Sequence, residues 1–389
     1  VFVGQRSASV SSSDLSVGAL REAAERAVAM ARLAPEDPFA GLAPAELLAS
    51  GPFADLDIDD PAEPGAADLK ARALAAEDAA RAIPGVTNSE GGGASAGVVV
   101  MALATSTGFR GGKRSTSHGT SASVVAGSGG DMQRDYAWHS ARHLADLESA
   151  AEIGARAGRR AVQRLHPIKL ASGAMPVLFD PRVSSSLLGH LAGAITGSAI
   201  ARGTSFLKDR MGQRILPAGI HIIDDPLRPR GLRSRAFDGE GLAARRTAII
   251  EDGVLTTWLL DSASARQLGL APTGHAARGA SGPPGAGTSN LHLEGGTLTP
   301  AELMADIRQG VLVTELIGMG VNGLTGDYSR GASGFLIENG EITRPVAEIT
   351  IAGNLIDMFA RLVAANDLAF RHASNAPTLR IDGMMVAGS

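Results

Sequence analysis

The stretch GFLIENGEITRPV (residues 334–346) decides the fold class of this chain. Two β-prone runs flank an Asn-Gly dipeptide (339–340), and both of its residues tolerate the positive φ that a type I′ turn requires. The segment RRTAIIEDGVLTTWLLD (245–261) repeats the pattern around an Asp-Gly dipeptide (252–253). We therefore predict two β-hairpins and a C-terminal half built mainly from antiparallel strands.

The rest of this half alternates strands with a few helices. A run of Ala, Gly and Leu at 184–200 predicts a buried helix, because it is apolar but too short to span a membrane. A capping box predicts a second helix at 299–309. Further predicted elements are strands at 176–180 and 378–388 and a Gly/Pro/Ser-rich loop at 274–290.

The N-terminal half predicts helices and an antiparallel sheet. Helices are expected at 16–33 and 66–82, strands within 86–137, and a long helix at 136–165 that ends before His166-Pro167. No regular βαβ alternation occurs, so the fold class is α+β. We predict an N-terminal α+β domain (1–168) and a β-rich C-terminal domain (169–389) containing the Ala/Gly-rich helix. The first residues resemble the middle of a strand, so the true N-terminus is expected to be missing.

Composition narrows the class of function. The 389 residues carry a net charge of -4, and the Arg residues are scattered among Asp and Glu, so direct nucleic-acid binding is not expected. The chain has no Cys, which excludes disulfides and thiolate ligands and suits the cytoplasm. No apolar run approaches the ~20 residues of a membrane span, so no membrane partner is expected.

Several blocks across the chain resemble one family. The most specific is TGDYSRGASGF (325–335), and LLGHLAGAI (187–195), FDGEGLAARR (237–246), PVAEITIAGNLIDMF (345–359) and GSGGDMQRDYAW (127–138) accompany it. Together they resemble the PmbA/TldE branch of the TldD/PmbA peptidase family, whose older label is modulator of DNA gyrase.

This resemblance implies a cytoplasmic complex of two similar subunits that acts on unfolded or flexible peptides. The TldD-type subunit carries zinc on a His-Glu-x-x-x-His helix motif and a Cys near its C-terminus. The TldE-type subunit lacks that site and helps form the substrate path. We expect this chain to be the TldE-type subunit, with no cofactor of its own, a zinc-bearing TldD-like partner, and a homodimer as its state in isolation.

The aligned motif supports that assignment. His190 takes the place of the first motif His, whereas Leu191 stands where the general base belongs and Ile195 where the second His belongs. A zinc hydrolase needs N, O or S ligands and a base beside the bound water. We therefore predict no catalytic or metal residue in this chain and interpret His190 as a core histidine.

Other histidines leave an alternative open. His139 and His143 are spaced i, i+4 and would share one face of the predicted helix, although no acidic third ligand is evident. His275 and His292 flank the predicted loop, where they either line a groove or are solvated. The alternative functions are thus an active peptidase with a rearranged metal site, and a binding protein for DNA gyrase.

The best candidate for a functional loop is Asp327, Tyr328, Ser329 and Arg330. It combines two opposite charges, a phenol and a hydroxyl just before a hairpin. We predict either a substrate-path or interface loop, to which His275 also contributes, or an internal Asp327–Arg330 ion pair.

Overall fold

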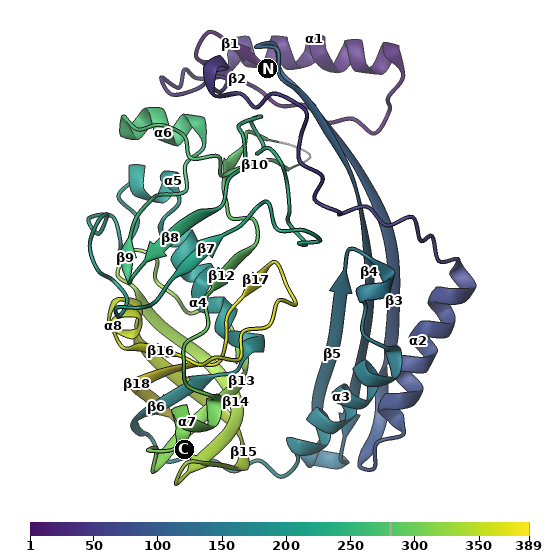
Figure 1. The fold of residues 1–389 in the computed structure, drawn as a ribbon, viewed down its shortest axis with the longest axis vertical. Helices are drawn as coiled ribbons and strands as arrows, with labels where there is room; N and C mark the ends of the chain where they lie inside the picture. The colour runs from purple at the N-terminus through teal and green to yellow at the C-terminus, as the bar shows by residue number, and fades with distance from the viewer. Residues whose placement is uncertain (280–281, 389) are drawn as a thin grey trace.

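The computed structural model describes residues 1–279 and 282–388 and has the predicted α+β architecture with two domains (Figure 1). The chain begins with a short hairpin and a helix, α1 (Val17–Leu33), which Ser16 caps by accepting a hydrogen bond from the backbone N–H of Ala19. The hairpin strands are β1 (Phe2–Val3) and β2 (Arg6–Ser7).

A three-stranded antiparallel sheet in the order β3-β4-β5 forms the N-terminal domain. Its strands are β3 (Val86–Ala104), β4 (Arg110–Ala126) and β5 (Gln133–Ala141). Helices α2 (Ala66–Arg81) and α3 (Ala150–Gln163) pack on one face around a small apolar core. In Figure 1, β3 and β4 run from these two helices towards α1 at the other end of the molecule.

The predicted helix at 136–165 is wrong over its first half. Along β5 the buried residues Asp135 and Ala137 alternate with the exposed Tyr136 and Trp138, which is the period of two of a half-buried strand. The helix starts only after Ser149, whose side chain caps it. Pairing with β4 therefore overrides the helical propensity of the Ala and Arg residues here.

Two sheets make up most of the C-terminal domain. The larger has the order β15-β14-β13-β6-β18-β16, and an additional β15–β18 pairing closes it on itself. The smaller has the order β17-β12-β7-β8-β9. The strands of the larger sheet are β6 (Gly173–Phe179), β13 (Gln309–Ile317), β14 (Asp327–Glu338), β15 (Glu341–Asn354), β16 (Leu362–Ala364) and β18 (Leu379–Ala387). Those of the smaller sheet are β7 (Ile222–Asp224), β8 (Thr247–Glu251), β9 (Val254–Leu255), β12 (Leu291–Leu293) and β17 (Ser374–Asn375).

Both predicted hairpin turns are confirmed. The dipeptides at 252–253 and 339–340 join β8 to β9 and β14 to β15, with φ of 47° and 77° in the first and 51° and 84° in the second. Positive φ at both central residues is the type I′ signature. The predicted loop at 274–290 contains a small pair of strands, β10 (Ala276–Ala277) and β11 (Gly285–Ala286), while residues 280–281 of it lie outside the described part of the chain.

Helix α4 (Pro181–Ala194) lies between the two sheets and contacts β6 and β13 of one and β12 and β17 of the other. The Ala/Gly-rich helix is thus buried as predicted, but it does not continue to residue 200. The backbone of Ile195 and Gly197 bonds instead to Leu259, and a separate short helix, α5 (Gly197–Ala201), follows. The remaining α-helices of the described residues are α6 (Ser262–Leu268), α7 (Pro300–Met304) and α8 (Leu355–Ala360).

The predicted helix at 299–309 is shorter than expected. Its capping box between Thr299 and Glu302 is confirmed, but α7 ends at Met304 because Ile307 and Arg308 instead accept backbone bonds from the 339–340 turn. No helix of residues 1–279 and 282–388 has the length and apolar character needed to cross a bilayer.

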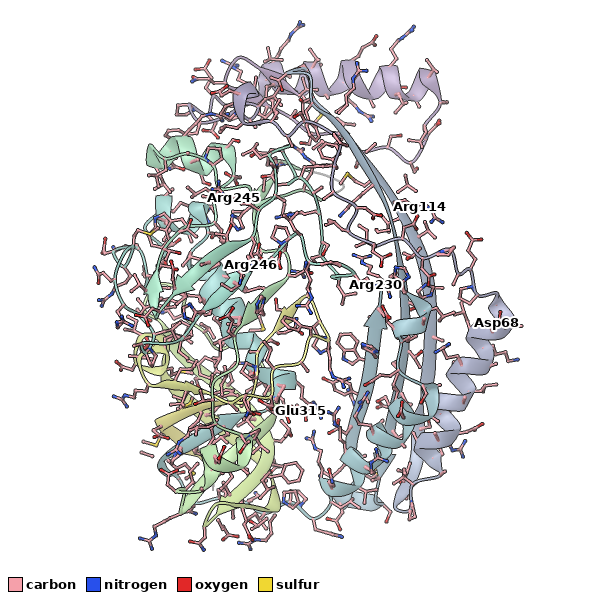
Figure 2. All side chains as sticks on the ribbon, viewed as in Figure 1. Asp68, Arg114, Arg230, Arg245, Arg246 and Glu315 are labelled. Atoms are coloured by element: carbon pink, nitrogen blue, oxygen red, sulfur yellow. The ribbon has the colours of Figure 1, made fainter. Side chains whose placement is uncertain are left out.

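Ion pairs clamp the two domains together. Arg164, at the end of α3, contacts Asp135 of β5 at 3.3 Å and Glu315 of β13 at 2.5 Å. Arg182 of α4 donates to the same Asp135 at 2.9 Å. Arg230 pairs with carboxylates of the N-terminal domain, and Figure 2 shows Arg230 and Glu315 on the side of the C-terminal domain that faces the three-stranded sheet.

Candidate functional site

The helix that the family resemblance predicts to match the zinc motif is α4, and its sequence explains its position. Asp180 caps it by accepting from the backbone N–H of Arg182, and Pro181 occupies the first turn, where a missing N–H is harmless. Leu187, Leu188 and Leu191 then fall on the face that enters the core. The motif positions are therefore fixed by core packing.

Leu191 and Ile195 are part of the main hydrophobic core. Leu191 is 1% exposed and Ile195 is fully buried. Their side chains offer no ligand and no base, so the residues at these positions do not fit a zinc ion, which takes nitrogen, oxygen or sulfur ligands. His190 is the single imidazole that this helix offers.

His190 packs edge-on against Tyr328 of β14, with 5.9 Å between the ring centroids and 79° between the ring planes. Burial, and secondarily the positive charge of Arg330, lowers the pKa of His190. The imidazole is therefore neutral near neutral pH. Its Nε2 is buried, without a hydrogen-bond partner among the described residues.

Tyr328 and Arg330 also present unpaired polar atoms in this neighbourhood. Tyr328 is 1% exposed, and its hydroxyl has no partner in the described part of the chain. Burial raises the pKa of the phenol, which keeps it protonated. The Nε of Arg330 is likewise buried and unpaired within residues 1–279 and 282–388. His190, Tyr328 and Arg330 thus bring three groups that can donate hydrogen bonds to the neighbourhood of residue 190. None of these three groups is a carboxylate.

The predicted Asp327–Arg330 ion pair does not form. Asp327 accepts instead from the hydroxyl of Thr325 at 2.6 Å and the amide of Asn354 at 3.1 Å, and these bonds lower its pKa. The physical reason is that these residues belong to a strand, where positions three apart point to opposite faces. Tyr328 faces the core, whereas Asp327 and Ser329 are exposed.

His139 and His143 do not share a helix face. His139 lies on β5, and its Nδ1 accepts from the backbone N–H of Glu148 at 3.1 Å. His143 lies beyond the strand, with Nε2 3.1 Å from a carboxylate oxygen of Asp57. In residues 1–279 and 282–388, no group of three or more His, Asp or Glu side chains is arranged to share a metal ion.

His275 and His292 are buried rather than solvated. His275 is 2% exposed, and its Nδ1 lies 2.9 Å from the hydroxyl of Thr273 while its Nε2 lies 3.5 Å from Asp224. Burial, together with the charge of Arg235, lowers the pKa of His275 to about 4. Burial raises the pKa of Asp224 to about 6, against the hydrogen bonds from Ser289. His275 therefore belongs to a buried polar cluster and has no access to substrate in this conformation.

Comparison with known proteins identifies the family. The profile of the PmbA/TldA metallopeptidase C-terminal domain matches residues 172–388, and the central-domain profile matches residues 59–165. The chain belongs to the PmbA/TldD metallopeptidase family. The family predicted from the sequence motifs is thereby confirmed.

Two relatives of this PmbA/TldD family member align along its whole length. The chain is 42% identical to the metalloprotease PmbA of Escherichia coli O157:H7 over 100% of its own length and 84% of that protein. It is 36% identical to a metalloprotease PmbA homologue of Haemophilus influenzae, covering 85% of it.

Solved structures share the fold. A candidate modulator of DNA gyrase from Bacteroides thetaiotaomicron superimposes with a TM-score of 0.92 at 30% identity, covering 100% of this chain and 87% of the other. TldE from Thermococcus kodakarensis superimposes with a TM-score of 0.80 at 22% identity, covering 95% and 85%.

Proposed function

We propose that this chain is the TldE-type, non-catalytic subunit of a TldD–TldE zinc peptidase that degrades or matures unfolded peptides in the cytoplasm. The observation that carries the proposal is the burial of Leu191 and Ile195 at the positions of the motif's base and second ligand. A chain with these residues has no group there to activate water, so the zinc chemistry belongs to a TldD-like partner.

The structure of TldE from Thermococcus kodakarensis supports the assignment, since it has the same fold over 95% of this chain. The exposed side chains of Asp327 and Ser329 are the parts of the candidate loop that can meet a substrate or partner. Tyr328 and Arg330 alternate with these two residues along β14, and their side chains lie on its opposite, more buried face. In isolation we expect the chain to self-associate through the surface that normally meets the partner.

The test compares this chain alone with the chain plus a TldD-type subunit that carries His-Glu-x-x-x-His. Each preparation is loaded with zinc, its metal content is measured, and it is offered an unstructured peptide. The chain alone is expected to bind no stoichiometric zinc and to cleave nothing, whereas the mixture cleaves. Replacing the motif Glu of the partner by Gln should abolish cleavage.

The matched control variant in this chain is His190→Ala. Because His190 is assigned no catalytic role, the mixture containing this variant should cleave at an unchanged rate. Cleavage by the chain alone that persists through further purification and disappears in His190→Ala would overturn the proposal and restore a rearranged metal site in this subunit.

A further inference from the structure

A cavity of about 890 Å³ separates the two domains at the end of α4 away from His190. The N-terminal domain contributes side chains of β5 and α3, and the C-terminal domain contributes the start of α4 and the segment before β17. We call this space the interdomain cleft and define it by Tyr136, Trp138, Arg160, Arg182, Arg233 and Arg371. Neither the family match nor the proposed function assigns it a ligand.

The cleft is lined by more positive than negative side chains. Five arginines line it, namely those named above and Arg156, against two carboxylates, Asp180 and Asp367. Both carboxylates are already engaged: Asp180 caps α4, and Asp367 accepts two hydrogen bonds from Thr378. With both carboxylates counted, arginines still outnumber acidic side chains in the lining by five to two.

Two of the arginines have no acidic partner among the described residues. Arg156 and Arg371 share Glu148, and Arg182 pairs with Asp135. The guanidinium of Arg160, in contrast, donates only to the backbone carbonyl of Tyr136, at 3.4 Å. Burial, and secondarily the charge of Arg182, lowers the pKa of Arg160, while the charges of Asp135 and Asp180 oppose that shift without pairing to its guanidinium. Arg233 is exposed, and its guanidinium makes no hydrogen bond or ion pair in the described part of the chain.

The walls of the cleft also suit an extended polypeptide. Trp138 is 42% exposed and stacks on His372 with 4.4 Å between ring centroids, while the guanidinium of Arg182 lies over the ring of Tyr136 at 5.1 Å. Strand β5 is the last strand of its sheet, and β17 is the last strand of the smaller C-terminal sheet. A strand at the edge of a sheet offers unpaired backbone groups to a passing chain.

We propose that the interdomain cleft binds an acidic peptide segment in extended conformation, with Arg160 and Arg233 pairing to its carboxylates. Arg pairs with carboxylates through strong, often bidentate hydrogen bonds. Tyr136 and Trp138 supply flat apolar surface for the intervening side chains. Binding needs only this chain; that the bound segment is substrate on its way to a zinc-bearing partner rests on the proposed function.

A nucleic acid is the less favoured occupant. Backbone pairing at a strand edge is open to a polypeptide and closed to a sugar-phosphate chain. Discrimination between the two is therefore part of the test.

The experiment measures binding of labelled peptides to the isolated full chain by fluorescence anisotropy. The probes are an unstructured peptide rich in Asp and Glu, the same peptide with Asn and Gln in their place, and a single-stranded oligonucleotide. The acidic peptide should bind, its binding should weaken as salt is raised, and the other two probes should bind at least about tenfold more weakly. Trp138 gives a second signal, because its emission should change on binding and the change should vanish in Trp138→Phe.

Matched variants locate the site. In Arg160→Gln/Arg233→Gln the affinity for the acidic peptide should fall by about tenfold or more, because two charge-assisted pairs are lost. The control is Arg159→Gln/Arg202→Gln, which removes the same charge from the next residue of α3 and from another exposed arginine outside the cleft, and should change affinity by less than about twofold. The single variant Arg233→Gln changes only an exposed side chain and keeps the test valid if the double variant unfolds.

Three results would overturn the proposal: equal loss of affinity in the two double variants, equally tight binding of the neutral peptide, or tighter binding of the oligonucleotide. The assay involves no partner and no hydrolysis. A negative binding result would therefore not affect the assignment of the chain as a TldE-type subunit. Conversely, if that assignment proves wrong, a measured affinity for the acidic peptide would still be valid.

Discussion

Replacing Asp135 by alanine tests whether the ion-pair clamp holds the two domains together. Asp135 is 2% exposed and accepts from Arg164 at 3.3 Å, from Arg182 at 2.9 Å and from the backbone N–H of Tyr136 at 2.7 Å. The side chains of Arg164 and Arg182 are only 10% and 14% exposed. The variant therefore leaves two nearly buried guanidiniums short of a counter-charge.

The expected loss follows from that burial. Removing one partner of a buried ion pair destabilises a protein by about 3–5 kcal/mol, and Arg164 keeps Glu315, so we expect the loss to stay within this range. An unfolding entropy of about 2.1 cal/mol/K per residue gives about 0.8 kcal/mol/K for a chain of 389 residues, which converts the loss to a Tm decrease of about 4–6 °C. The conversion assumes that both domains unfold together.

Urea unfolding and thermal melting measure the change, with Glu36→Ala as the control. Glu36 makes a single ion pair with Arg6 at 3.3 Å, and the two side chains are 64% and 39% exposed, so its loss should change stability by about 1 kcal/mol or less. The double variant Asp135→Ala/Arg182→Ala should lose less than the sum of the single variants, because the second change removes the orphaned charge. Additive losses, or an Asp135→Ala variant as stable as Glu36→Ala, would refute the clamp.

Three further changes have defined outcomes. A Cβ at Gly334 would lie 1.9 Å from the carbonyl oxygen of Leu312, so Gly334→Ala should lose about 1–3 kcal/mol in urea unfolding, whereas Gly173→Ala, whose Cβ meets nothing within 4 Å, should be nearly neutral. Asp224 has a pKa of about 6 in the folded protein against its ordinary value of 3.8, so its contribution to stability falls as pH rises from 3.8 to about 6. His275 has a pKa of about 4 in the folded protein against 6.5, so its contribution to stability rises as pH rises from about 4 to 6.5. Asp224→Asn should therefore make stability rise more steeply between those pH values than in the unchanged protein, which urea titrations across the window would detect. Thr299→Ala removes the cap of α7 and should lower stability by about 1 kcal/mol, while Thr299→Ser, which keeps the hydroxyl, should not, as thermal melting would show.

Local chemistry made much of the fold predictable. Dipeptides that accept positive φ marked both hairpins, and Ser16 and Thr299 marked helix starts, because each signal depends on one or two neighbouring residues. The motif substitutions at 191 and 195 were equally readable, since an apolar residue cannot be a ligand. These signals needed no knowledge of the tertiary structure.

Features that depend on distant residues were not predictable. The sequence pattern predicts helix over part of the strand at 133–141, because only pairing with β4 distinguishes the two conformations. The contact between Arg371 and Glu148 joins positions 223 apart, and that between Arg164 and Ser333 joins positions 169 apart. The interdomain cleft is built from such contacts, so no local pattern pointed to it. His275 was expected at a loop surface because nothing near it in sequence reveals the burial of Asp224.

The apolar side chains at 191 and 195 also bear on how this subunit can evolve. Under the proposed subunit role, a gain of hydrolysis at this helix would require an acid and an imidazole inside the hydrophobic core, together with a third ligand from elsewhere in the chain. Each polar group placed there without its metal is destabilising by about 1–3 kcal/mol, so every intermediate would fold less well before any gained activity. If the chain has the proposed role, this loss of stability at each step makes the specialisation of the two subunits hard to reverse.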